Sequence, residues 1–365
     1  MDIRLATVTD GPSCNSFYNR IYERQRTDQQ WLWEFAHRIP GQDELPFVRA
    51  LEGSSVIGTQ ALIPVRFIDK QGEFWTAKSE ETLVDPNMRG QNVFGRMYDL
   101  TFDVARDRDY KSIWGFTPAE RAFTRIGFEI PTYTKQIICV IGFGGTFTIT
   151  KDRMSLGPMA KSLLPLVDLA MLSWSFVLRI FNGWRSKRIQ IVTLEDSEEI
   201  DEGLSKDFIS TYGGTTILRD SSYLRWRFFE NPYCKATVLA AVMNRKIYAY
   251  LAFSVDAEGR GQIIDVIAGN TAHDIGVDRI ALRGLIAEAL RRMRRMGAKA
   301  VRGWTLNDHK FDKLMRQLYY QAGFVKVNRG SAVVLHTNFG QAARKDHDDF
   351  SNWYVTRAFT EGTHG

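Results

Sequence analysis

The stretch from Ser79 to Gly95 constrains the fold most, because it predicts a strand, a tight turn and a helix in direct succession. Glu81–Val84 is typical of a buried strand, and Pro86 ends it because proline has no N–H to donate to a sheet. From Val93 onward, apolar residues recur at helical spacing. A glycine-containing loop that opens into a helix presents free backbone N–H groups and the positive end of the helix dipole, which suits a pyrophosphate.

Two motifs carry a family resemblance: V-D-P-x-x-R-G-x-x-x-F at Val84–Phe94, and Arg-Ile-Gly-Phe at Arg125–Phe128. Together they resemble the acyl-CoA-binding core of the GNAT superfamily of N-acyltransferases. The family's usual loop is Arg/Gln-x-x-Gly-x-Gly/Ala, and here Asn92 and Phe94 stand at the two small positions. Asparagine tolerates a positive φ, so the turn can still form. Taken alone, the loop is also compatible with an ordinary strand-to-helix connection.

The resemblance implies how the cofactor would be held. Backbone N–H groups near Leu83 and Val84 would contact the thioester and pantetheine of acetyl-CoA or a related acyl-CoA, and the loop would bind the pyrophosphate. The loop residues are Arg89, Gly90, Gln91, Asn92, Val93, Phe94 and Gly95. Many members use a tyrosine four residues before the Gly-Phe pair as the acid that reprotonates CoA, and that position is Phe123 here.

GNAT chemistry is direct attack of an amine on a thioester, so a proton must leave the ammonium group. Glu80 and Glu81 are the carboxylates available as base, and a partly apolar cleft raises a carboxylate pKa toward the useful range. Neighbouring strand residues point to opposite faces, so only one of the two faces the acyl group. We favour Glu81, because the internal repeat aligns it with Asp265 and the branch that the chain resembles tends to carry an acid five residues before the proline.

The second half of the chain repeats the pattern of the first. Tyr223–Pro232 is similar to Trp31–Pro40, and Gln321–Phe324 matches Arg125–Phe128. We therefore expect an α/β fold of two tandem GNAT-like units, each a mixed central sheet flanked by helices, with a degenerate second copy.

The repeat also predicts domain boundaries. These are a GNAT-like acyl-CoA-binding domain at 1–150, a helical connector at 151–188, a degenerate GNAT-like domain at 189–340 and a C-terminal tail at 341–365. Acyl-CoA is expected in the first copy alone, because Asp274 and Asp278 stand where phosphates would approach the second. The tail segment Ser351–Thr356 resembles tandem GNAT-like proteins associated with surface-polysaccharide or amino-sugar modification. We expect an amine acceptor, with an amino sugar as one candidate, at the seam between the copies.

Within the connector, Ser162–Phe181 is almost wholly apolar. It is about long enough to span a bilayer, but Pro165 and Asp168 argue against a span. An inter-domain helix or helical hairpin is the first interpretation. An interfacial membrane-surface helix is the second, because cations flank the segment and Trp174 and Trp184 accompany it. Peripheral membrane contact through 162–184 therefore stays open.

Composition limits which classes of partner, metal site and cellular location the sequence predicts. A length of 365 residues with 44% hydrophobic and 25% charged residues is typical of a soluble globular protein of two domains. Three cysteines and six histidines show no ligand spacing, so neither a disulfide framework nor a metal site is predicted. The N-terminus has no apolar signal core, which predicts a cytoplasmic location, or a peripheral one at the inner face of the membrane. A net charge of +6 would attract CoA phosphates but indicates no nucleic-acid partner.

Three functions remain open from the sequence, and the oligomeric state is undetermined. The first is an N-acyltransferase, with N-acetyl transfer as the leading form. The second is a non-catalytic tandem GNAT-like CoA-binding module, motivated by Asn92, Phe94 and Phe123. The third is a Fem-type aminoacyltransferase, which shares the tandem architecture but has no use for the CoA loop.

Overall fold

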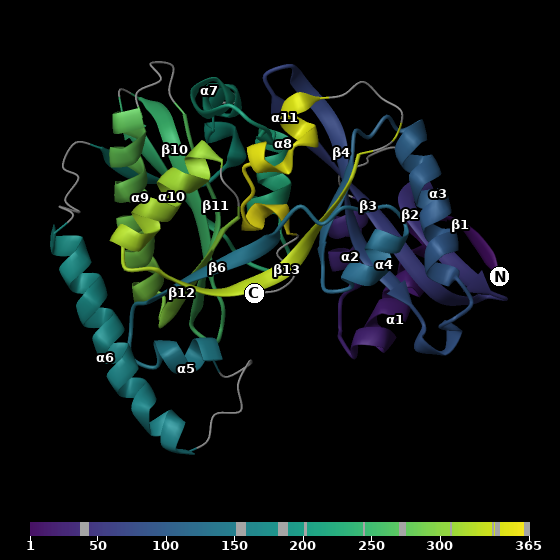
Figure 1. The fold of residues 1–365 in the computed structure, drawn as a ribbon, viewed down its shortest axis with the longest axis horizontal. Coiled ribbons are helices and arrows are strands. Elements are labelled where there is room, and N and C mark those ends of the chain that lie inside the picture. The colour runs from purple at the N-terminus through teal and green to yellow at the C-terminus, as the bar shows by residue number, and fades with distance from the viewer. Residues whose placement is uncertain are drawn as a thin grey trace. The chain divides into compact units, whose positions relative to one another are not determined.

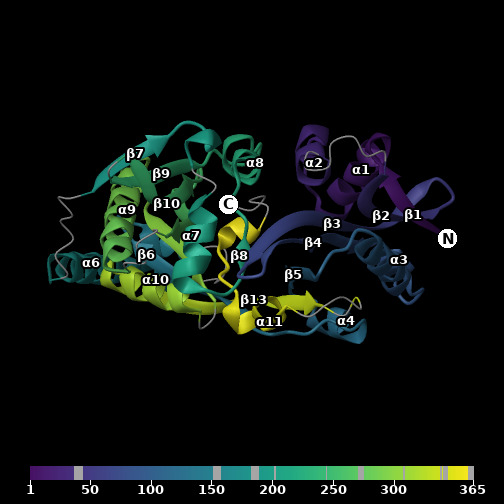
Figure 2. The same cartoon turned by 90° about the horizontal axis from the view of Figure 1, so that it is seen from above.

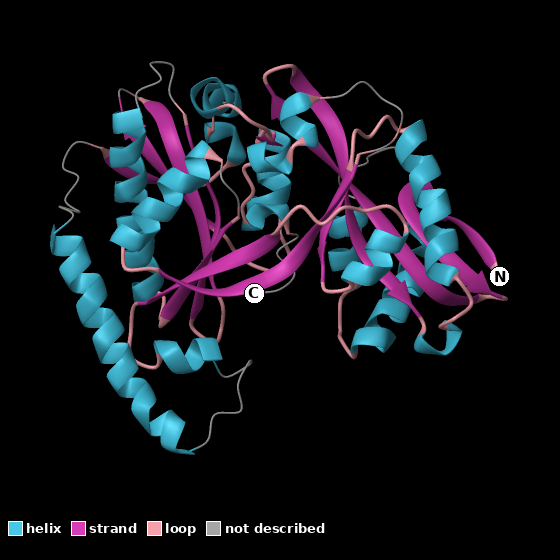
Figure 3. Ribbon diagram, in the orientation of Figure 1, coloured by secondary structure: helices cyan, strands magenta, loops and turns pink. Residues whose placement is uncertain are grey.

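The structure is a computed structural model that describes residues 1–36, 44–150, 158–181, 189–200, 203–243, 245–269, 275–306, 309–337, 339 and 344–360. Over these residues the chain is a mixed α/β protein with helices flanking the strands, as the sequence predicts (Figure 3). The chain divides into two compact units. Unit 1 comprises Met1–Phe67, Gln71–Tyr133 and Ser331–Asp348, and unit 2 comprises Ile68–Lys70, Thr134–Gly330 and Asp349–Gly365.

In unit 1 the strand order is β1-β2-β3-β4-β5-β13. The strands are β1 Asp2–Thr7, β2 Glu44–Glu52, β3 Ser55–Asp69, β4 Gly72–Val84, β5 Ile113–Thr117 and β13 Val325–His336, of which the part from Ser331 onward belongs to this unit. The helices are α1 Gly11–Tyr22, α2 Asp28–Phe35, α3 Val93–Asp107, α4 Glu120–Arg125 and α11 Lys345–Asp348. Figure 2 shows α1 and α2 over one face of this sheet and α3 over the other.

In unit 2 the strand order is β13-β6-β12-β11-β10-β9-β7. The strands are β6 Tyr133–Val140, β7 Gln190–Leu194, β8 Thr216–Ile217, β9 Thr237–Met243, β10 Lys246–Val255, β11 Arg260–Ala268 and β12 Ala300–Thr305. The helices are α5 Gly145–Thr150, α6 Pro158–Phe181, α7 Gly203–Tyr212, α8 Ser221–Leu224, α9 Ile275–Arg295 and α10 Lys310–Gln321. Figure 1 labels these elements along the chain.

The two units share one topological feature. Each has a single long helix joining two parallel strands: α3 joins β4 to β5, and α9 joins β11 to β12. Each parallel pair is followed in the sheet by an antiparallel neighbour, β13 next to β5 and β6 next to β12. This correspondence is the one that the sequence repeat predicts.

The strand, turn and helix predicted for Ser79–Gly95 are present. β4 ends at Val84, and Asp85 caps a 3-10 turn at Pro86–Met88 by accepting the N–H of Asn87 at 3.0 Å. The helix α3 then begins at Val93, as its apolar spacing predicts.

Two local features bear on where the strands end. β6 stops at Val140, and Gly145–Thr150 forms the helix α5. β3 runs through Pro64 without a break, from Ser55 to Asp69. The compact units also differ from the ranges 1–150, 151–188, 189–340 and 341–365, which stay a prediction of domain boundaries.

The apolar segment of the predicted connector is one helix, α6, with Pro165 inside it. Its window Lys161–Leu178 has a mean hydropathy of 1.4 and only 11% of its residues are buried. By length and composition this helix is apolar enough to cross a membrane, which by itself is weak evidence of a span. Trp184 and the cations at 185, 187 and 188 lie outside the described residues, as does Asp274.

Candidate active site

The parallel ladder between β4 and β5 is short. It pairs Ala77 with Ile113 and Lys78 with Trp114, while β4 continues to Val84. Gly115 still lies close to β4, because a Cβ at this position would stand 3.0 Å from the carbonyl oxygen of Ser79. Beyond this point β4 leaves its parallel neighbour, and the predicted acyl-CoA contacts lie on this departing part of the strand.

The loop after β4 is held at its start and exposed in the middle. Met88 is buried and anchors the 3-10 turn, while Arg89, Gly90 and Gln91 are exposed. Gly90 has a φ of 85°, which favours glycine, and nothing lies within 4 Å of its Cβ position. The predicted Arg-Gly turn is therefore open to solvent.

Asn92 ends the loop with a φ of 54°, a positive value that asparagine tolerates. A Cβ on Gly95 would stand 2.5 Å from the Oδ1 atom of Asn92, so the asparagine side chain folds over the first turn of α3 because position 95 is glycine. The first helical N–H groups, those of Val93, Phe94 and Gly95, have no acceptor within the helix. N–H donors at the start of a helix, next to an exposed arginine, fit a pyrophosphate.

The two aromatic departures from the family pattern pack against each other. The rings of Phe94 and Phe123 meet edge to face at 5.7 Å, and both contact Tyr98, at 4.8 and 5.6 Å. Phe123 is 5% exposed and belongs to a core cluster that includes Phe128. The bulky residue in the loop therefore has a packing role that the sequence pattern did not reveal.

Glu81 has an unusual backbone and a buried side chain. Its φ is 50°, a strained value for a residue with a Cβ, and its side chain is 2% exposed. The Oε2 atom accepts from Nη1 of Arg26 at 2.5 Å, whereas Oε1 is buried without a hydrogen-bond partner among the described residues. Burial raises the pKa of Glu81 to about 7, although Arg26 favours the charged form.

Arg26 is fixed by groups from α1 and α2. Its Nη1 atom also donates to Glu34 at 2.7 Å, so two carboxylates share one nitrogen. Its Nε atom donates to Asn15 at 2.8 Å, and its guanidinium lies 3.8 Å from the ring centre of Tyr18. Sequence reasoning missed this cluster, and the only available signal was that a buried carboxylate needs a cation.

The other predicted site residues are divided between environments. Glu80 is half exposed and forms an ion pair with the buried Lys78, so it does not share the environment of Glu81. Leu83 is buried and Val84 is partly buried at the end of β4. The structure thus places Glu81, Leu83 and Val84 on one strand leading into the exposed loop.

A hydroxyl network that the sequence analysis missed connects α3 to β4. The Tyr98 hydroxyl lies 2.8 Å from Oγ of Ser79 and 3.1 Å from Oγ1 of Thr82. Gln60 donates to Ser79 at 3.1 Å and accepts from Thr82. Burial raises the pKa of Tyr98, so its proton stays on the oxygen at neutral pH. The one sequence signal for this network was the presence of a tyrosine, Tyr98, on the helix that follows the loop.

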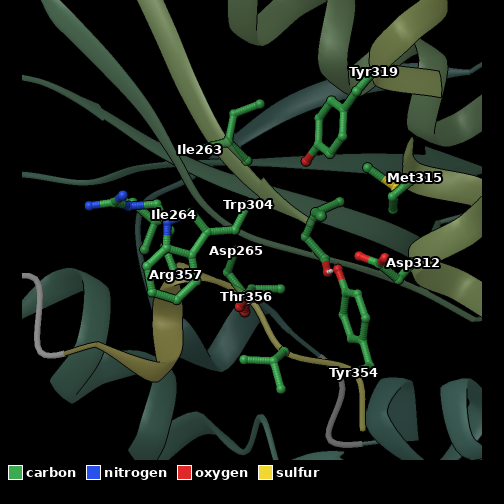
Figure 4. A pocket seen from close by; sticks show the side chains of 12 residues that line it. Ile263, Ile264, Asp265, Trp304, Asp312, Met315, Tyr319, Tyr354, Thr356 and Arg357 are labelled. Carbon is green, nitrogen blue, oxygen red and sulfur yellow. Dashed lines mark hydrogen bonds between the residues drawn. The ribbon is translucent and has the colours of Figure 1, made fainter. Parts of the chain in front are cut away.

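In unit 2, side chains fill the region beyond the parallel ladder of β11 and β12, which is the counterpart of the β4–β5 ladder in unit 1. The ladder between β11 and β12 ends at Gln262 and Arg302, and a pocket beyond it is lined by β11 and by the segment 354–357 (Figure 4). Tyr354 donates its hydroxyl proton to the carbonyl of Val266 at 2.6 Å. The remaining space is about that of one water molecule, far too small for a pantetheine arm.

Asp265, which the repeat aligns with Glu81, is saturated with donors. Its carboxylate accepts hydrogen bonds from Nε and Nη2 of Arg219 at 2.8 and 3.0 Å, from the Tyr250 hydroxyl at 2.6 Å and from the Thr356 hydroxyl at 2.7 Å. Burial alone would raise the pKa of Asp265, but these partners, Arg219 first, hold it below the ordinary value. The two aligned acids therefore differ: one is a fixed anion, and the other titrates near neutrality with one free oxygen.

Models of protein families and curated proteins give no match to the chain. Solved structures do. A GCN5-related N-acetyltransferase from Kribbella flavida covers 92% of this chain and 70% of its own, with a TM-score of 0.58 and 12% identity. For a probable N-acyltransferase from Enterococcus faecalis the shares are 92% and 72%, with a TM-score of 0.61 and 8% identity.

Saccharomyces cerevisiae N-myristoyltransferase, solved with bound myristoyl-CoA, is similar at a TM-score of 0.59 and 11% identity, over 92% of this chain and 82% of its own. At these identities the likeness shows the fold, which is that of GNAT-type proteins over most of the chain.

Proposed function

We propose that the protein is an N-acyltransferase that binds acyl-CoA in unit 1 and transfers the acyl group to an amine. One observation carries the proposal: the buried carboxylate before the exposed loop, Glu81, has a free oxygen and a pKa of about 7. A carboxyl group at this pKa is half ionised at neutral pH, which suits a general base. The GNAT-type fold and the myristoyl-CoA bound in one neighbour support the choice of cofactor.

In the proposed reaction, Arg89 and the N–H groups at the start of α3 bind the pyrophosphate. The amine nitrogen attacks the thioester carbon, backbone N–H groups near Leu83 and Val84 stabilise the oxyanion, and the C–S bond breaks as the C–N bond forms. The free Oε1 of Glu81 takes the ammonium proton through a bridging water. The departing CoA thiolate is protonated from solvent, since Phe123 has no proton to give.

Acetyl-CoA, or another acyl-CoA, is the proposed co-substrate, and a small-molecule or sugar amine, for instance an amino sugar, is the proposed acceptor. The loop residues do not indicate which amine is acylated. The choice of acceptor therefore rests on the resemblance of the tail segment Ser351–Thr356. One observation favours a non-catalytic acyl-CoA-binding module as the second candidate. Glu81 is held in an ion pair with Arg26, which would leave a purely structural role for the carboxylate.

Calorimetry with acetyl-CoA tests binding, and turnover with a panel of amines tests catalysis. We expect one site per chain, and Arg89→Glu should weaken binding by about 1–3 kcal/mol because it places a carboxylate beside the pyrophosphate. Lys310→Glu makes the same charge change on an exposed residue of unit 2 and should leave affinity unchanged. Equal losses in both variants would refute the loop as the binding site.

Catalysis is tested by Glu81→Gln, which keeps the shape and removes the base. Affinity for acetyl-CoA should stay nearly constant, while turnover falls by roughly 100-fold. Binding without turnover of any amine in the wild type would favour the non-catalytic module. Absence of acetyl-CoA binding would favour the Fem-type aminoacyltransferase, which does not need the loop.

A further inference from the structure

One side of α6 is docked onto unit 2. Asp168 is buried and accepts the backbone N–H groups of Gly144 and Thr146, at 2.7 and 2.8 Å. Met171 and Leu172 pack against the core cluster of β6, α5 and β12. Ser175 is buried one turn further on. Because residues three, four and seven apart share a helix face, these contacts define one docked stripe.

The opposite side of α6 is exposed and apolar. Its large apolar side chains are between 41% and 66% exposed: Leu163, Leu166, Val167, Leu169, Trp174, Phe176, Val177 and Ile180. Between Ser162 and Ile180, the exposed polar side chains that the structure describes are two serines, Ser162 and Ser173. Monomeric soluble proteins rarely expose so many neighbouring apolar side chains, and such patches mark interaction surfaces.

The patch continues onto the neighbouring helix. Phe143 and Phe147, just before and within α5, are 65% and 46% exposed, and α5 packs beside α6 (Figure 1). We call the exposed residues of α6 together with these two phenylalanines the apolar face. It is built on two helices of unit 2 whose mutual position is fixed by the Asp168 hydrogen bonds.

Exposed cations lie on α6 and next to the loop before α5. Lys161 is exposed at the first turns of α6. Lys299 is exposed, its carbonyl accepts from the N–H groups of Ile141 and Gly142, and its side chain lies beside Gly144. Arg294 and Arg295 are exposed at the end of α9, a few residues before Lys299. Over the described part of unit 2, none of these four cations is in an ion pair, and the only acid of α6, Asp168, is buried on the docked side.

We propose that the apolar face is a membrane-docking surface, which inserts its apolar side chains at the interface of a bilayer with anionic lipid headgroups. An apolar helix side with an exposed tryptophan and a cationic rim is the composition that binds such surfaces. The docked stripe explains why α6 lies on the membrane rather than across it, because one side already contacts protein. A second copy of the chain is a poorer occupant, since two cationic rims would meet.

The surface is tested by sedimenting the full chain with vesicles. Vesicles of phosphatidylcholine mixed with phosphatidylserine should bind the protein, and pure phosphatidylcholine should bind it at least about tenfold less, since anionic lipid attracts each cation near the surface. Raising the salt concentration should weaken binding. Absence of binding to either vesicle would overturn the proposal.

Two variants locate the surface. Leu166→Glu with Phe176→Glu places charges at the two most exposed apolar positions of α6, and we expect binding to fall by about tenfold or more. Lys161→Glu with Lys299→Glu should abolish the preference for anionic lipid. Ile280→Glu, at a 41% exposed apolar residue on α9, is the matched control and should bind like the wild type.

Circular dichroism and thermal unfolding establish that each variant is folded, and only folded variants are compared. Unchanged vesicle binding in the folded Leu166→Glu, Phe176→Glu variant would refute the proposal. The proposal would also be refuted if sedimentation equilibrium showed that the wild type forms a concentration-dependent dimer and this variant does not, because a second copy would then cover the apolar face. Acyl transfer is not measured in these experiments, so their outcome is independent of the proposed function.

Discussion

Replacing Glu81 by glutamine should change how the stability of the protein depends on pH. The folded-state pKa of about 7 lies above the ordinary value of 4.5, so the folded protein holds this proton more tightly than the unfolded chain. The favourable contribution of the protonated group is complete below pH 4.5 and is lost as the pH rises through 7. Glutamine keeps the shape and cannot titrate.

The expected magnitude follows from the two pKa values. At about 1.4 kcal/mol per pH unit, a rise from 4.5 to about 7 lowers the free energy of unfolding of the wild type by about 3 kcal/mol between pH 4 and pH 8. The variant lacks this loss. The variant's free energy of unfolding minus that of the wild type should therefore grow by about 3 kcal/mol over the same range, whatever the pH-independent effect of the substitution.

Urea unfolding at several pH values measures this difference directly. Other titrating groups, such as the buried His347, are common to both proteins and cancel. Glu52→Gln, the same substitution at an exposed glutamate at the end of β2, is the control for the chemical change itself. A constant difference for Glu81→Gln, or one that shrinks with rising pH, would show that Arg26 keeps Glu81 charged and would remove the basis for its role as base.

Two further predictions concern the loop and the second acid. Asn92→Val should lower the free energy of unfolding by about 1–2 kcal/mol, because a β-branched residue is strained at a φ of 54°, and it should weaken acetyl-CoA binding. Asn92→Gly should bind normally in calorimetry, and equal affinities of the two variants would contradict the proposed loop geometry. Asp265→Asn should lower the free energy of unfolding by about 3–5 kcal/mol at pH 7, because Arg219 loses its buried counter-ion. Because the pKa of Asp265 is lowered in the folded protein, the difference in free energy of unfolding between wild type and variant should shrink as the pH falls. Acetyl-CoA affinity should not change. A loss of unfolding free energy below about 1 kcal/mol at pH 7 would contradict this reasoning.

Local signals in the sequence predicted the strand, turn and helix around the loop. Pro86 ends β4, Asn92 adopts the positive φ, and the apolar spacing from Val93 sets α3. These features depend on neighbouring residues, so pattern and turn chemistry are sufficient to predict them. The same reasoning placed Glu80 and Glu81 on opposite sides, which agrees with their different burial.

The contacts of Glu81 could not be predicted, because they join distant parts of the chain. Arg26 is 55 residues away in sequence, and nothing in its own neighbourhood marks it as the partner of a carboxylate. The packing of Phe94 against Phe123 is hidden in the same way, since each residue alone reads as a departure from the family pattern. The proposed site residues of the loop and strand stay predictions until binding is measured.

The division of β13 bears on how the protein is made. β5 lies in the first third of the chain, but the part of β13 that pairs with it follows Ser331, where Ala332 pairs with Thr117 and Val334 with Gly115. A ribosome that has synthesised residues 1–150 has therefore not yet produced the strand that completes the sheet of unit 1. Until it does, β5 presents an open edge that can pair with other chains. Unit 1 therefore cannot finish folding until its last segment, Ser331–Asp348, has been translated, which happens after most of unit 2.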